Sequence, residues 1–468
     1  MLSYNPGNIH AGSYRTCIHA GPPPHYDAAY VSPGTRSGLE KLYSMLEKLF
    51  AFLLLLSSMN VVTALTLSSK EQIDLRVFSA NMDTSSVLID AAIYTYGAAL
   101  ILMRWRQVLR AARTAWPLLV LAGLAFLSTA WSVEPMLTLR RSVLLLASTT
   151  IAIYIGERYS IKAFAHLLAQ TLCLMIVLVL LVYLVAPEYV IDDSAYGGAW
   201  KGLSTYKNTF GEHMAVAVLL LVLVRFRRLP WLRYVFLLIA AGLLFLSHSA
   251  TAVVCCILML AAVPLWRMNR GKQSLLVGVL IALAFSLGIY WLLAFPEVIF
   301  QVLGRDATLT GRTDLWSKLL PVIANRPVLG YGYAAFWTGS NAEVLNVWIS
   351  AGRLVPIADN GYVDLCLSLG AAGLGLFLCV FTGAFRKAIE YLRSERGFVV
   401  LWPVTYLCIF AADNICESAL LTRGTFPFLV FAIVTTSLAL SHKRAVTAAQ
   451  TADPQPFMWE LHPRVISR

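Results

Sequence analysis

Residues 172–185 read LCLMIVLVLLVYLV, and this stretch decides the fold class. It ends an apolar run over residues 164–185. A helix needs roughly 17–25 such residues, at a rise of about 1.5 Å each, to cross the hydrocarbon of a bilayer. Because backbone N–H and C=O groups in lipid must be satisfied within their own segment, the run predicts a transmembrane helix. We therefore expect an integral membrane protein.

The composition of the whole chain indicates the same class. Of its 468 residues, 58% are hydrophobic and 13% are charged, whereas soluble domains carry about 25% charged residues. This shortage of charge excludes an ordinary soluble domain. The formal net charge is +12. The basic residues stand in short clusters between apolar runs, which indicates topology signals and no nucleic-acid partner.

Apolar runs of similar length recur along the chain and predict about twelve transmembrane helices. The expected fold is therefore an all-α polytopic membrane protein with one large extracytoplasmic loop between helices nine and ten. The predicted spans are residues 48–67, 86–103, 116–132, 140–156, 164–185, 211–226, 232–247, 250–266, 274–294, 361–383, 398–416 and 424–441.

The remaining segments divide the chain into parts. Residues 1–43 hold several prolines and no periodicity, which predicts a disordered N-terminal tail, and we hypothesise that translation starts at or near Met45. Residues 44–294 then carry helices one to nine, and residues 295–360 form the large periplasmic loop. Residues 361–441 carry helices ten to twelve, and residues 442–468 form a cytoplasmic tail.

Lysine and arginine concentrate in alternate loops. The positive-inside rule therefore puts both termini in the cytoplasm and the segments 187–210 and 295–360 on the outer face. Three tryptophans in the large loop predict that it is folded, with a surface helix near residues 313–325 that ends at Arg326-Pro327. The basic loops are residues 104–113, 158–162, 225–233, 267–272, 386–396 and 443–444.

Metal and redox chemistry find little support in the sequence. The eight cysteines contain no CxxC pair, so neither a zinc site nor a disulfide framework is indicated. Neither a Walker A loop nor a His-Glu-x-x-His motif is present. Asp192-Asp193 is an adjacent acidic pair on the outer side that could hold Mg²⁺, but an exposed loop pair is more often only solvated.

The first polar patch on the outer side is WKGLSTYKNTFG, residues 200–211. Its two lysines, Lys201 and Lys207, flank a glycine turn at the start of a helix. A lysine near a helix N-terminus suits an anionic ligand such as phosphate. The alternative is that both lysines contact lipid headgroups.

The second patch is GRTDLW, residues 311–316. We expect Thr313 to cap the N-terminus of the surface helix. Arg312 would then project its forked guanidinium toward phosphate or sugar. The alternative pairs Arg312 with Asp306 or Asp314 to hold the loop together.

The third patch is DNGYVD, residues 359–364, where the large loop re-enters the membrane. The helix dipole favours the Asp359 carboxylate at this helix start. The alternative is that Asp359 serves only as an N-cap. Gly370 and Gly373 follow, and we expect them to allow close helix packing.

These patches, in this order and topology, resemble the O-antigen ligase and O-antigen polymerase family over residues 45–440. The early WSxEP element and the Ser-rich element favour the exopolysaccharide polymerase (ExoQ-type) branch. Asp359 stands where the family usually has His, and Tyr206 replaces another frequent His. The matching motifs are Lys207-Asn208, STAWSVEP at 128–135, LSHSATA at 246–252, residues 311–316 and 330–336, and Asp359-Asn360 followed after nine residues by Gly370-x-x-Gly373.

The resemblance implies a membrane glycosyltransferase of the bacterial cytoplasmic (inner) membrane. It would polymerise or transfer an undecaprenyl-diphosphate-linked oligosaccharide onto an acceptor hydroxyl at the periplasmic face, in exopolysaccharide or O-antigen biosynthesis. The acceptor would be a glycan or lipid A-core. The resemblance implies no cofactor and no metal, and it makes a flippase and a chain-length regulator candidate partners beside the lipid bilayer itself.

The resemblance also assigns roles to residues. Asp359, in place of His, is the candidate base for the acceptor hydroxyl, and Arg312 and Lys207 are candidates to neutralise the diphosphate. The tyrosines would stack on sugar rings. Candidate substrate-binding residues are Lys201, Asn208, Asn360, Tyr206, Tyr331, Tyr362, Arg305 and Arg423.

Two other functions remain open from the sequence. A lipid-linked oligosaccharide transporter or flippase would need ionisable residues near the membrane midplane, where the predicted helices carry few. A non-catalytic partner in polysaccharide assembly is the other alternative, and Asp359 standing in place of His lends it some weight, although the enzyme remains the preferred interpretation. Within the enzyme reading, polymerase and ligase share a donor and differ only in the acceptor.

Overall fold

The computed structural model describes residues 38–66, 84–192, 198–226, 228–268, 308–352 and 354–451, and nearly all regular structure within them is helical. The helices are α1 (Gly38–Ser58), α2 (Val61–Thr66), α4 (Thr84–Met103), α5 (Trp105–Thr114), α6 (Trp116–Leu127), η1 (Ser128–Ala130), α7 (Pro135–Arg158), α8 (Ile161–Val185), η2 (Pro187–Tyr189), α9 (Lys207–Leu223), α10 (Leu232–Leu246), α11 (Ala250–Met268), α14 (Thr308–Asn325), α15 (Ala342–Ala351), α16 (Gly361–Ser394), η3 (Phe398–Leu401), α17 (Trp402–Cys416) and α18 (Phe426–Thr451).

A helix occupies all or part of every predicted span except residues 274–294, which lie outside the described residues. By length and composition, five described helices can cross a membrane, or six if α5 and α6, bent by 88°, form one span. The polytopic helical fold is therefore confirmed. The count of twelve and the position of the large loop between helices nine and ten remain predictions.

Two boundaries differ from the expectation. Helix α1 already begins at Gly38, inside the predicted tail of residues 1–43, and α18 continues to Thr451, beyond the predicted span. Residues 1–37, which include Cys17, lie outside the described part of the chain.

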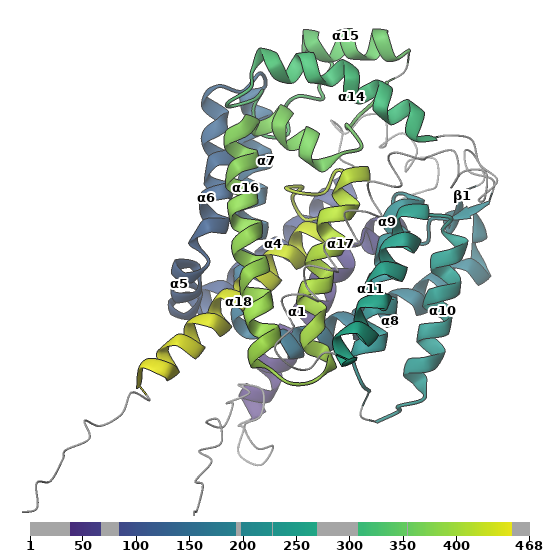
Figure 1. Ribbon diagram of the computed structural model, residues 1–468, viewed down its shortest axis with the longest axis vertical. Coiled ribbons are helices and arrows are strands. Elements are labelled where there is room, and N and C mark those ends of the chain that lie inside the picture. Colours follow the sequence, from purple (N-terminus) through teal and green to yellow (C-terminus); the bar gives the residue numbers. More distant parts are fainter. Residues whose placement is uncertain are drawn as a thin grey trace, which may run out of the picture.

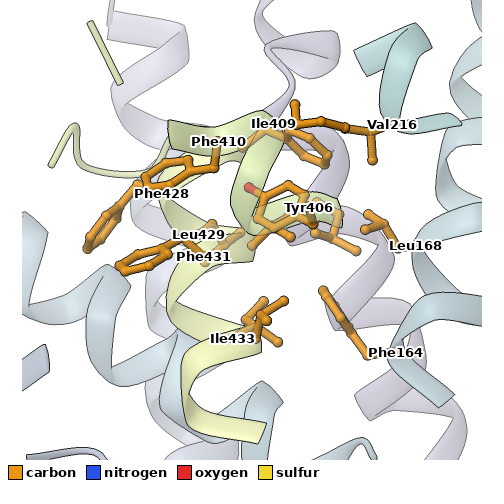
Figure 2. Close-up of a cluster of buried hydrophobic side chains, with 14 of the residues drawn as sticks. Phe164, Leu168, Val216, Tyr406, Ile409, Phe410, Phe428, Leu429, Phe431 and Ile433 are labelled. Carbon is orange, nitrogen blue, oxygen red and sulfur yellow. The ribbon is translucent and has the colours of Figure 1, made fainter. Parts of the chain in front are cut away.

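The core of the bundle is aromatic where α17 and α18 meet (Figure 2). The rings of Phe410 and Phe431 stack with centroids 4.8 Å apart and planes 9° from parallel. The hydroxyl of Tyr406 donates to the Pro427 carbonyl at 2.7 Å, so the one polar atom of this buried side chain is satisfied. Lipid tails are as apolar as the helix faces, so dispersion between closely packed rings is what holds such helices together. Phe164 and Leu168 of α8 extend the cluster.

Helices α14 and α15 lie across one end of the bundle, and the C-terminal part of α18 projects at the other end (Figure 1). The predicted folded loop is thus confirmed for its described residues, and α14 ends at Asn325, directly before Arg326-Pro327. The helix starts at Thr308, five positions earlier than expected. Thr313 therefore lies inside α14, and the prediction that it caps the N-terminus is wrong.

The tryptophans of this layer hold it to its neighbours by their indole N–H groups. Trp316 donates to the Ala358 carbonyl at 2.8 Å, and Trp348 donates to the Val355 carbonyl at 2.7 Å. A separate apolar core forms beneath the two helices, because their inward faces bury each other. Its fully enclosed members include Leu315, Leu319, Phe336, Val344 and Val347.

A kink at Gly370 lets the large loop insert its backbone into α16. Gly370 has φ 62°, and a Cβ there would lie 2.3 Å from the Val328 carbonyl oxygen, so only glycine fits. The close neighbour is loop backbone, which corrects the expectation of helix-on-helix packing at this residue. The backbone groups freed by the kink are satisfied by four bonds: Tyr331 N to Leu367 O, Gly332 N to Ser368 O, Ala371 N to Pro327 O and Ala372 N to Val328 O.

The early WSxEP element, residues 131–135, hydrogen-bonds to the same loop on the side away from α16. The indole of Trp131 donates to the Leu329 carbonyl at 3.0 Å, and the backbone N–H of Val133 donates to the Tyr331 carbonyl at 3.0 Å. A Cβ at Gly332 would lie 2.3 Å from the Ser132 hydroxyl oxygen, which shows how closely the two segments approach. Residues 327–332 are therefore held between α16 and the turn after α6.

Candidate functional site

The three predicted patches meet at Arg312 on α14. Its Nε lies 3.6 Å from Oδ2 of Asp359, and its Nη2 lies 3.8 Å from Oε1 of Glu417. The Asn208 amide donates to the same Oε1 at 2.7 Å. One guanidinium thus joins the start of α9, the large loop and the segment after α17, which are far apart in sequence.

The first patch is shaped by a short hairpin before α9. Strands β1 (Ile191–Asp192) and β2 (Ala199–Trp200) pair antiparallel. The backbone N–H of Lys201 donates to the Val190 carbonyl at 2.9 Å, and the Lys201 side chain is buried. Lys207 is the first residue of α9, next to Asn208, and Tyr206 before it is 38% exposed. Lys207 and Tyr206 therefore stand at the start of α9 beside Asn208, while the Lys201 side chain is buried under the hairpin.

In the third patch, Asn360 caps a helix and Asp359 contacts Arg312. The Asn360 side chain caps α16, accepting from the N–H groups of Tyr362 at 3.0 Å and Val363 at 3.1 Å. Asp359 has φ 50°, in the left-handed region that Asp adopts more readily than most residues. Asp359 is therefore not the N-cap. Its carboxylate, 30% exposed, turns toward Arg312 instead.

Glu417 is the member of the site that sequence reasoning missed. Its backbone carbonyl accepts from the Gly361 N–H at 2.8 Å, which ties it to the start of α16. Its side chain is 19% exposed. Burial raises the pKa of Glu417 to about 7, against the opposing effect of Arg312, and Asp359 raises it further while the Asn208 hydrogen bond lowers it. A carboxyl group with this pKa can take up or release a proton near neutral pH.

Two further acids lie one helical turn deeper. Glu212 follows Asn208 by four residues on α9, and Asp413 precedes Glu417 by four residues on α17, so each pair shares a helix face. Both side chains are buried, and Glu212 interacts electrostatically with Asp413 and Glu417. The expectation that the helices carry few ionisable residues thus overlooks two buried acids, Glu212 and Asp413, that lie close enough to Glu417 to interact with it.

Two of the tyrosines predicted to stack on sugar rings, Tyr331 and Tyr362, donate their hydroxyl groups to backbone carbonyls within the protein. Tyr331 is 3% exposed, and its hydroxyl donates to the Val322 carbonyl at 2.9 Å within the loop core. The Tyr362 hydroxyl donates to the Ala411 carbonyl at 2.8 Å between α16 and α17. Tyr331 is therefore buried and Tyr362 partly buried between elements, and the role of both residues in substrate binding remains a prediction. Tyr206 keeps an exposed ring.

Of the last two predicted residues, only Arg423 lies in the part of the chain that the structure describes. Arg305 lies outside the described residues. Arg423 lines a separate cavity together with Asp90 and Arg141. Among the residues that the structure describes, no group of three His, Cys, Asp or Glu side chains is arranged to hold a metal ion. Asp192 is buried in β1, and its neighbour Asp193 falls outside the described part.

Comparison with known proteins supports the resemblance drawn from the motifs. Residues 234–378 match the family described as O-antigen ligase. The chain is 26% identical over 335 residues to the exopolysaccharide production protein ExoQ of Rhizobium meliloti, covering 68% of this chain and 74% of that protein. It is 28% identical over 177 residues to the O-antigen ligase of Pseudomonas aeruginosa, covering 38% of this chain and 39% of that protein. Both Arg312 and Asp359 fall inside the matched family segment.

Proposed function

Because the chain is related to the O-antigen ligase family and to its ExoQ-like branch, we propose that it is a membrane glycosyltransferase. It polymerises or transfers an undecaprenyl-diphosphate-linked glycan onto an acceptor hydroxyl at the periplasmic face of the bacterial inner membrane, with both of its termini in the cytoplasm. The observation that carries the proposal is the position of Arg312, within 4 Å of both Asp359 and Glu417. A cation and a proton acceptor therefore stand side by side.

The reaction needs one bond made, one broken and one proton moved. The acceptor oxygen bonds to the anomeric carbon of the donor sugar, and the bond from that carbon to the diphosphate oxygen breaks. The electron pair leaves with the undecaprenyl diphosphate. The hydroxyl proton passes to a carboxylate, and Glu417 fits this role because a base works best when its pKa lies near the operating pH. Asp359, the base expected from the family pattern, then acts by tuning Glu417.

Arg312 is placed to stabilise the negative charge that develops on the leaving diphosphate. Strong guanidinium–oxyanion bonds are about 2.7–2.9 Å long, whereas Arg312 lies 3.6 and 3.8 Å from its two carboxylates. The two carboxylates orient the guanidinium, and the proposed diphosphate would bind it in competition with them. Lys207, at the start of α9 next to Asn208, adds a second cation, and the helix N-terminus there also favours an anion.

Polymerase activity is favoured over ligase activity, because the similarity to the ExoQ protein extends over more of this chain than the similarity to the O-antigen ligase. The similarity to the ExoQ protein spans 68% of this chain, against 38% for the O-antigen ligase of Pseudomonas aeruginosa. The acceptor in this reading is a second lipid-linked glycan, and in the ligase reading it is lipid A-core. The flippase and the chain-length regulator are proposed as partners in the same machinery.

A lipid-linked oligosaccharide transporter is the second candidate, and the two buried acids favour it. Glu212 and Asp413 are ionisable groups inside helices, and such groups often mark transport paths. A transporter or a non-catalytic partner makes no covalent product, so a chemical assay separates these functions from glycosyl transfer.

The experiment incubates the purified full-length protein in detergent with a lipid-linked oligosaccharide and an acceptor, and follows products by mass. We expect a new glycosidic product, lost with Arg312→Ala and reduced about 10²–10⁴-fold with Glu417→Gln, the range for removing a general base. Lys318→Ala is the matched control, since Lys318 stands on the same helix but pairs with Asp314 at the surface. Full activity of Arg312→Ala would refute the assignment of the active site to Arg312. Absence of any product from the wild type would refute the proposal that the protein is a glycosyltransferase.

A further inference from the structure

Helix α5 is short, basic and sharply bent away from the apolar helix that follows it. It holds Arg106, Arg110 and Arg113 within ten residues and carries no acidic residue. At a rise of about 1.5 Å per residue, such a helix is too short to cross the hydrocarbon of a bilayer, where arginine is also costly. Because α5 is bent by 88° from the helix after it, it does not continue the direction of that span. These features fit a helix that lies along the bilayer surface.

The side chains of α5 form three strips along the helix. Successive residues are about 100° apart around the axis, so Val108 and Ala111 share one face, and both are buried. This face belongs to the core of the bundle, where α5 contacts α7 and α18. Trp105 and Leu109, one turn apart, form an apolar strip beside it and are 54% and 46% exposed.

The third strip consists of Arg106, Arg110 and Arg113, whose side chains are all exposed. No ion pair between described residues involves any of them. The guanidinium of Arg106 lies 5.3 Å from the centre of the Trp105 ring, and Nε of Arg110 donates to the Arg106 carbonyl at 3.2 Å. Since a guanidinium carries five N–H donors, most of these donors are open to the oxygens of an external anion.

Arg104, the residue directly before α5, gives a contrast within the same loop. Its Nε lies 2.8 Å from Oε1 of Glu47, and its guanidinium lies 5.3 Å from the centre of the Tyr43 ring. Both partners belong to α1. The charge of Arg104 is therefore balanced inside the protein, whereas the three charges on α5 face outward together.

We propose that α5 is a docking surface for anionic phospholipids, whose headgroup phosphates pair with Arg106, Arg110 and Arg113. Trp105 and Leu109 enter the boundary of the hydrocarbon, while the arginines stay at the level of the phosphates. Figure 1 shows α5 beside α18, toward the end of the bundle away from α14 and α15. The proposed topology places that end at the cytoplasmic leaflet, where anionic lipids attract basic segments. Only the choice of leaflet rests on the proposed topology, and lipid binding itself depends on neither the topology nor glycosyl transfer.

The test counts the lipids bound to the purified full-length protein by native mass spectrometry. The protein in detergent receives equal amounts of phosphatidylglycerol and phosphatidylcholine with the same acyl chains, so that the two lipids differ in net charge. We expect the wild type to retain phosphatidylglycerol preferentially. Replacing all three arginines with glutamine should reduce this preference by about 10²-fold, because each basic residue near an anionic surface contributes about fivefold.

Arg113→Gln alone should reduce the preference by about fivefold. The Arg113 side chain has no hydrogen bond or ion pair among the described residues, so this variant tests the proposal even if the triple variant is poorly folded. Replacing the three arginines with lysine keeps the charge and should keep most of the preference. Raising the salt concentration should weaken the preference of the wild type, because salt screens exposed charges.

The charge-matched control carries Arg386→Gln, Lys387→Gln and Arg396→Gln. These residues lie in and after the last part of α16, where Arg386 pairs with Glu390 at 3.7 Å. The control should lose much less of the preference than the triple variant of α5. If the wild type shows no preference for phosphatidylglycerol, or if the control loses as much as the α5 variant does, the proposal is overturned.

Discussion

Replacing Asp359 with asparagine distinguishes the two carboxylates that could accept the proton. If Glu417 is the base, the transfer rate follows its deprotonated form. Because burial raises the pKa of Glu417 to about 7, the ionised fraction should be small at pH 6 and predominant at pH 8. Asp359 raises this pKa through its negative charge. Asp359→Asn should therefore keep the protein active and move the alkaline rise in rate to lower pH.

The size of the shift follows from the geometry around Arg312. The two carboxylates sit on different nitrogens of one guanidinium, at 3.6 and 3.8 Å. For two unit charges about 4 Å apart, Coulomb's law gives about 1 kcal/mol in bulk water and about 4 kcal/mol at an effective dielectric constant of 20, and about half of these energies at twice the distance. One pKa unit is about 1.4 kcal/mol, so the expected shift is about half a unit to nearly two units.

The assay records kcat/KM for transfer between pH 5 and pH 9, because this ratio reports the pKa of the free enzyme. Asp314→Asn is the matched control, since Asp314 lies on α14 near Arg312 but is 59% exposed and paired with Lys318. Its profile should coincide with that of the wild type. Thermal unfolding of each variant shows whether the fold is retained.

Two results would refute the reasoning. If Asp359→Asn is folded but inactive at every pH, then Asp359 is itself the base and Glu417 is not. If the variant is active and its profile does not move, the charge of Asp359 does not reach Glu417, and the described geometry of the site is wrong.

Three further predictions use other contacts. Asn208→Ala removes a hydrogen bond that lowers the pKa of Glu417, so kcat/KM should rise at higher pH than in the wild type, and an unmoved profile would contradict this. Glu417→Gln tests stability: burial raises the pKa of Glu417, so its contribution to stability is full below about pH 4.5 and is lost as pH rises through about 7. The melting temperature of the wild type should therefore fall relative to Glu417→Gln across that window, and parallel curves would exclude the raised pKa. Gly370→Ala should lower the melting temperature because of its positive φ and the Val328 carbonyl, at a cost of about 1–3 kcal/mol or more, whereas Gly375→Ala, with open space around it, should not.

The helical fold could be predicted from the sequence because its signal is local. The run at residues 172–185 falls inside α8, and the Arg326-Pro327 pair marks the end of α14. Both features depend only on nearby residues. The start of α14 was misplaced because the threonine at position 313 is a good cap in isolation, and nothing local reveals that the helix already began at Thr308.

The site was predicted in part, and the part that was missed depends on distant contacts. Arg312, Asp359 and Asn208 carry residue types suited to phosphate and proton chemistry, so each could be singled out alone. Glu417 could not, because its raised pKa comes from burial and from neighbours on other elements. The one sequence signal for Glu417 was that it is an acidic residue directly after the predicted span 398–416. The burial of Tyr331 could not be predicted either, since an aromatic ring in a loop looks exposed until the loop core is known.

The kink at Gly370 explains how a long loop can hold Arg312, the proposed catalytic cation, in a fixed place. The segment 327–332 hydrogen-bonds to both sides of the kink and to Val133 after α6, so the loop is fixed to the bundle by backbone bonds. Arg312 stands on the helix that leads into this segment. The N–H of Gly361 binds the carbonyl of Glu417, which fixes the start of α16 to the end of α17. The elements that carry Arg312 and Glu417 are thus fixed to the bundle by main-chain bonds, with the carboxylates of Asp359 and Glu417 at 3.6 and 3.8 Å from the guanidinium. A cation held in a fixed place can stabilise charge that develops on the proposed diphosphate leaving group without first having to move into position.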